Sequence, residues 1–195
     1  YVADEAKKIV WIADSSGIAY QKIESPPAEL LPDNFDYRPN KVVADTSGVI
    51  YVLSKGTVGG ALQFDANLNF MGFYGSEKVS ATAKVIVERF WRKVFSIFSR
   101  RMLEATKQFV PPSYVNFDIG ADDFIYTIRD QVENRRGQVR KLNAVGNNIL
   151  INGEQTIFGD IKVSSKYVDS LLVDIEVDSE GFISVLDDRR GRVFQ

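Results

Sequence analysis

A ten-residue pattern occurs twice in this chain and constrains its fold more than any other feature. Residues 45–54 read "DTSGVIYVLS" and residues 178–187 read "DSEGFISVLD". The carboxylates of Asp45 and Asp178 suit a tight turn, because an aspartate accepts hydrogen bonds from amides two residues on, and Gly48 and Gly181 supply the positive φ that such turns need. The pattern therefore predicts a strand, a turn and a strand, used at least twice.

Four passages align with this unit. Residues 39–75 and 112–160 read as complete units, residues 1–30 as the later half of one, and residues 172–195 as the beginning of another. In the third passage, aligning Phe124 with Phe182 places Gly120 at the aspartate position and Asp123 at the glycine position. We expect the turn to be kept there with its two key residues rearranged.

The repeats predict an all-β chain. Four-stranded meanders repeated every ~40 to 50 residues are typical of a β-propeller, in which each unit is one blade and the innermost strands line a central channel. A β-sandwich with chance internal similarity is the alternative fold. The repetition favours the propeller, with residues 1–195 as a single region.

Residues 76–111 interrupt the repeats and predict an α-helical insertion. Apolar residues recur there at steps of three and four, without Gly or Pro, until Pro111 and Pro112 end the pattern. The stretch 76–110 holds eight basic and three acidic residues, a charge of +5, whereas the whole chain has a net charge of −2. The insertion is therefore a basic amphipathic segment in an otherwise acidic chain.

Two residue types are absent, and their absence excludes several kinds of chemistry. The chain has no cysteine and no histidine. Ser-His-Asp and Cys-His catalysis, histidine acid–base chemistry and zinc bound by His or Cys are thus excluded within this chain. The near-neutral balance of 24 basic and 26 acidic residues gives no electrostatic reason to expect a nucleic-acid partner.

The repeat passages resemble a known family. "ADTSGVIYVLS", "FDANLNFMGFYG", "LNAVGNNIL" and "VDSEGFISVLDDRRGRVFQ" are similar to NHL-type β-propeller repeats. The helical interruption ending "FVPPSY", followed by "NFDIGADDFIYT", resembles extracytoplasmic propeller proteins of Gram-positive bacteria, some of which carry a Yip-type membrane domain. The resemblance implies an extracytoplasmic or membrane-associated location. It also implies a ring of six blades, so we expect these residues to belong to a longer protein.

The aspartates raise the alternative of an enzyme or a calcium-binding protein. Some six-bladed propellers are lyases or hydrolases, and a calcium site could be built from carboxylates. The candidate ligands are Asp45, Asp118 and Asp178, or the pair Asp122 and Asp123. Turn capping is the favoured interpretation, because aspartate before glycine is the repeat signature itself. We therefore expect no catalytic residue, no metal and no cofactor.

Two other features have a structural interpretation and a functional one. Aromatic residues at alternating strand positions are expected to fill the core between blades, although together they could also stack on a carbohydrate; they are Tyr51, Phe64, Phe124, Tyr126 and Phe182. The run "DDRRGR" at 187–192 could be a charged contact surface, but a solvated hairpin turn at Gly191 is favoured.

The insertion is the strongest candidate for a contact surface. Its apolar face could receive a protein partner or lie on an anionic membrane, or it could pack back onto the propeller. The residues expected to bind a partner are Arg89, Trp91, Arg92, Phe95, Phe98 and Arg101. The sequence thus predicts a non-enzymatic propeller scaffold at the cell envelope, which contacts a protein partner, a ligand or the remaining blades.

Overall fold

The computed structural model describes residues 1–31, 35–55, 60–75, 114–129, 138–150, 162–163, 166–167 and 170–195. Within these ranges the chain is all-β apart from one short 3₁₀ helix, η1 (Ala28–Leu30). The predicted helical insertion at 76–111, with all six of its candidate contact residues, lies outside the described residues. In the described part of the chain, no helix has the length and apolar character needed to cross a membrane.

The strands form four antiparallel meanders and a small hairpin. Sheet 1 contains β1 (Val2–Asp4), β2 (Ile9–Ala13) and β3 (Ala19–Ile23), and sheet 2 contains β4 (Pro39–Ala44), β5 (Ile50–Ser54), β6 (Ala61–Phe64) and β7 (Phe70–Tyr74). Sheet 3 contains β8 (Tyr114–Ile119), β9 (Ile125–Arg129) and β10 (Val139–Leu142). Sheet 4 contains β13 (Leu172–Val177), β14 (Ile183–Asp187) and β15 (Arg192–Phe194), and β11 (Lys162–Val163) pairs with β12 (Lys166–Tyr167).

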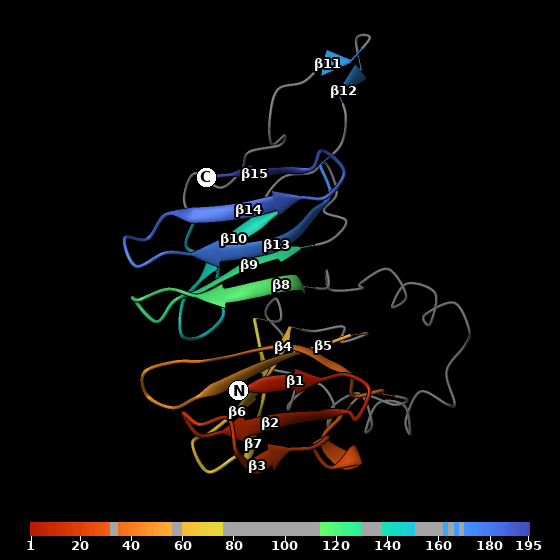
Figure 1. Ribbon diagram of the computed structural model, residues 1–195, viewed down its shortest axis with the longest axis vertical. Coiled ribbons are helices and arrows are strands. Elements are labelled where there is room, and N and C mark those ends of the chain that lie inside the picture. Colours follow the sequence, from red (N-terminus) through yellow and green to blue (C-terminus); the bar gives the residue numbers. More distant parts are fainter. Residues whose placement is uncertain are drawn as a thin grey trace, which may run out of the picture.

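The four sheets stack face to face in chain order, from red and orange through green to blue (Figure 1). One apolar cluster lies between each pair of neighbouring sheets. The alternation of side chains along a strand explains how a middle sheet serves two clusters. In β5, Ile50 and Val52 join the cluster with sheet 1, whereas Tyr51 and Leu53 join the cluster with sheet 3.

The first strands of successive sheets lie next to one another. β1 contacts β4, β4 contacts β8, and β8 contacts β13. Side chains of β8 bond to β13 across the gap: Asp118 Oδ2 accepts the amide of Val177 at 2.9 Å, and the Asn116 side-chain amide donates to Asp174 Oδ1 at 2.7 Å. Asp118 therefore satisfies a backbone amide at the edge of β13, and Asn116 adds a bond between side chains of the two sheets.

The predicted turns are present. Asp45 Oδ1 accepts the amides of Ser47 and Val49, and Asp178 Oδ1 accepts those of Glu180 and Phe182. Gly48 and Gly181 have φ of 87° and 88°. The same five-residue turn recurs at Asp14, Asp65 and Asn143. The prediction of a hydrogen-bonded aspartate turn is confirmed.

Sheet 1 matches the later part of the unit, because its first turn has the geometry of the turn between β14 and β15. Asp4 Oδ1 accepts the amide of Lys7, as Asp187 Oδ1 accepts that of Arg190. The residue after each of these amides has a positive φ, 59° at Lys8 and 58° at Gly191. β1 therefore corresponds to the second strand of the unit, the strand that β14 forms in sheet 4.

The positive φ of Gly191 confirms the hairpin turn predicted for "DDRRGR", but only part of that turn is solvated. The side chains of Asp187 and Arg190 are buried, and Arg190 Nε lies 3.6 Å from Asp187 Oδ2. Asp187 Oδ1 also accepts the amide of Leu171 at 3.1 Å. The first aspartate of the run thus ties the turn to the start of β13, which the sequence did not predict.

Candidate functional site

The rearranged turn of sheet 3 carries a cluster of polar and aromatic side chains. Gly120 and Asp123 keep the turn's two backbone hydrogen bonds, and Asp123 has a φ of 58°, as expected from its position. A Cβ added at Gly120 would lie only 2.6 Å from Asp122 Oδ1 and 2.9 Å from the Tyr126 ring. A side chain at Gly120 would therefore displace Asp122 or Tyr126 from its place in the turn.

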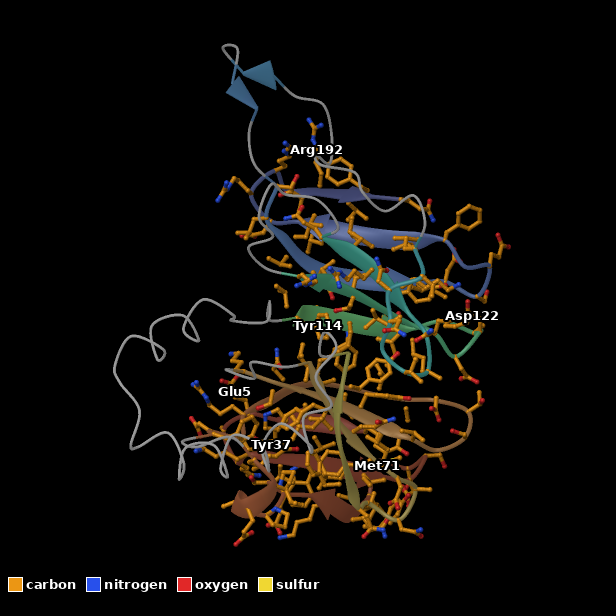
Figure 2. All side chains as sticks on the ribbon, turned by 180° about the vertical axis from the view of Figure 1, so that it is seen from behind. Glu5, Tyr37, Met71, Tyr114, Asp122 and Arg192 are labelled. Carbon is orange, nitrogen blue, oxygen red and sulfur yellow. The ribbon has the colours of Figure 1, made fainter. Side chains whose placement is uncertain are left out.

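Asp122 is the centre of this cluster, and it lies in the turn between β8 and β9, at one side of the stack (Figure 2). Its Oδ2 accepts hydrogen bonds from Lys141 Nζ at 2.7 Å and from the Tyr126 hydroxyl at 3.1 Å. The Lys141 ammonium also lies 4.6 Å from the centre of the Phe124 ring and 5.0 Å from that of Tyr126. We call these four residues, Asp122, Phe124, Tyr126 and Lys141, the Asp122 cluster.

Electrostatics keep both charged groups of the Asp122 cluster ionised. Partial burial alone would raise the pKa of Asp122, but hydrogen bonds from Lys141, Phe124 and Tyr126 outweigh it and hold the pKa below its ordinary value. The hydrogen bond to Asp122 raises the pKa of Lys141 above its ordinary value. A general acid or base needs a pKa near the working pH, and both of these pKa values move away from neutrality.

Asp123 links the neighbouring turn of sheet 2 to this cluster. Its Oδ1 accepts the backbone amide of Thr46 at 3.0 Å, and its Oδ2 accepts the Thr46 hydroxyl. Beside it, the Tyr51 hydroxyl donates to Asp45 Oδ2 at 3.2 Å. Burial, and to a smaller extent the charge of Asp45, raises the pKa of Tyr51 to about 12.

All five candidate calcium ligands have hydrogen-bonded roles within the chain. Asp45 and Asp178 cap their own turns, Asp118 bonds the edge of β13, and Asp122 and Asp123 bond Lys141 and Thr46. Among the residues that the structure describes, no three Asp or Glu side chains meet as a metal-binding group. Asp45 and Asp123 lie near each other, because Asp123 bonds Thr46, the residue that follows Asp45. Tyr51 bonds Asp45 in the same region, whereas Asp178 lies in a separate turn.

The aromatic prediction is confirmed for most strands and wrong for one residue. Tyr51, Phe64 and Tyr126 are buried between sheets, and Phe124 packs against the cluster between sheets 3 and 4. Phe182 is exposed, because it lies on the face of sheet 4 that no other described sheet covers. The described aromatic residues thus serve mainly as core.

Lys141 was missed by sequence reasoning. It belongs to β10, and the register of that strand places it directly opposite Tyr126 in β9. No short motif joins Lys141 to Asp122, since the intervening residues include the whole of β9. The only available signal was the replacement of the turn aspartate by Gly120, which marked this hairpin as different from its repeats.

Comparison with protein-family models, curated proteins and solved structures gives no match for this chain.

Proposed function

We propose that the chain is part of an NHL-like β-propeller and acts as a non-enzymatic binding scaffold at the cell envelope. The stacked meanders and the row formed by β4, β8 and β13, the first strands of their units, support the propeller, because its blades converge through their innermost strands. The location rests on the family resemblance. The basic segment at 76–111 is the proposed contact element, on the sequence pattern described above.

The non-enzymatic interpretation depends on one observation, the ion pair between Asp122 and Lys141 and the pKa shifts of its two members. Asp122 and Lys141 neutralise each other at 2.7 Å, and their pKa values are displaced away from neutral pH. Such a pair holds a fixed arrangement of hydrogen bonds and charge, which suits recognition rather than proton transfer. No contact on the described residues favours the alternative of a propeller enzyme or calcium-binding protein.

The proposed contact element is tested by vesicle binding. The chain would be sedimented with vesicles of phosphatidylglycerol and phosphatidylcholine, and with vesicles of phosphatidylcholine alone. We expect binding to the anionic vesicles and its loss in a Trp91→Ala, Phe95→Ala double variant, with an unchanged urea midpoint. A matched control replaces Tyr20 and Met71, two exposed apolar residues of the sheets, with Ala.

Two results would contradict the proposal of a contact element on this segment. One is undiminished vesicle binding by the double variant, and the other is binding by neither protein. Loss of folding in the double variant would assign Trp91 and Phe95 to the core. The enzyme alternative is tested separately by calorimetric titration with Ca²⁺, where a binding isotherm that Asp45→Asn and Asp122→Asn abolish would support it.

A further inference from the structure

We draw no further inference here: the strongest candidate, the cluster of Asp122, Phe124 and Tyr126 at the turn between β8 and β9, could hold an alkylammonium group only where Lys141 of the same chain already lies, and it belongs to the site already described.

Discussion

The backbone amide of Thr46 donates a hydrogen bond to Asp123 Oδ1 at 3.0 Å and so joins two hairpin turns that lie 77 residues apart in the chain. The Thr46 hydroxyl donates to the other oxygen of the same carboxylate. Asp123 makes this link from a backbone conformation with a φ of 58°. One residue therefore serves both the turn of sheet 3 and its junction with sheet 2.

Replacing Asp123 separates these two roles. Asp123→Ala removes both hydrogen bonds and keeps a side chain at positive φ, so we expect it to lower the free energy of unfolding by about 1–3 kcal/mol. Asp123→Gly removes the same bonds but relieves the backbone, and it should be the milder change by roughly 1 kcal/mol. Urea unfolding measures both. An alanine variant as stable as the glycine variant would contradict the role of φ.

One of the repeated turns is capped by an asparagine in place of an aspartate. Asn143 bonds the amides of Val145 and Asn147 through its side-chain oxygen, as Asp178 bonds those of Glu180 and Phe182. We therefore expect Asp178→Ala to cost about 1–2 kcal/mol, in the range of other side-chain caps. Asp178→Asn should cost a small fraction of that in the same urea titration. Equal losses in the two variants would point to a role for the charge.

Two glycines with similar backbone angles should respond differently to substitution. Gly146 and Gly181 have φ of 79° and 88°, but a Cβ at Gly146 would lie 2.6 Å from the backbone nitrogen of Gly75, whereas nothing lies within 4 Å at Gly181. Gly181→Ala should cost only the backbone strain, about 1–2 kcal/mol. Gly146→Ala should cost about 1–3 kcal/mol more, because β7 and the turn after β10 would have to separate. Thermal or urea unfolding of the pair gives the difference directly.

The Asp122–Lys141 pair should make stability depend on pH at both extremes. The pKa of Asp122 is lowered in the folded state, so its contribution is present above the ordinary value of 3.8 and is lost as the pH falls through the folded pKa. The pKa of Lys141 is raised, so its contribution is present below the ordinary value of 10.5 and is lost as the pH rises through the folded pKa. The pair therefore contributes fully between these two values.

Urea midpoints at pH 7 and pH 3 measure the acid side of this dependence. Lys141→Met should reduce the loss of stability between the two pH values, because the strongest partner of Asp122 is gone. Lys22→Met is the matched control, since it breaks the exposed ion pair with Glu24, where both side chains are about half accessible. An identical pH response in all three proteins would show that the pair carries no stability.

The outcome for individual residues shows what the sequence could predict. Asp45, Asp178, Gly48 and Gly181 were predicted correctly because a turn is a local structure, whose hydrogen bonds join residues no more than four apart. The rearranged turn at Gly120 and Asp123, in which glycine stands at the aspartate position, was predicted from the repeat alignment alone. Lys141 was not, because its contact with Asp122 depends on the register between β9 and β10.

The chain's amino-acid pattern by itself determined the strands, the turns and the all-β class, since side-chain alternation and turn chemistry act within a few residues. It also made both faces of each repeat apolar, which is why Phe182 was predicted to be core. Only the tertiary structure decided which of these faces is buried. Val185 packs against sheet 3, while Leu186, the next residue, is exposed, because burial requires a neighbouring sheet and not only an apolar side chain.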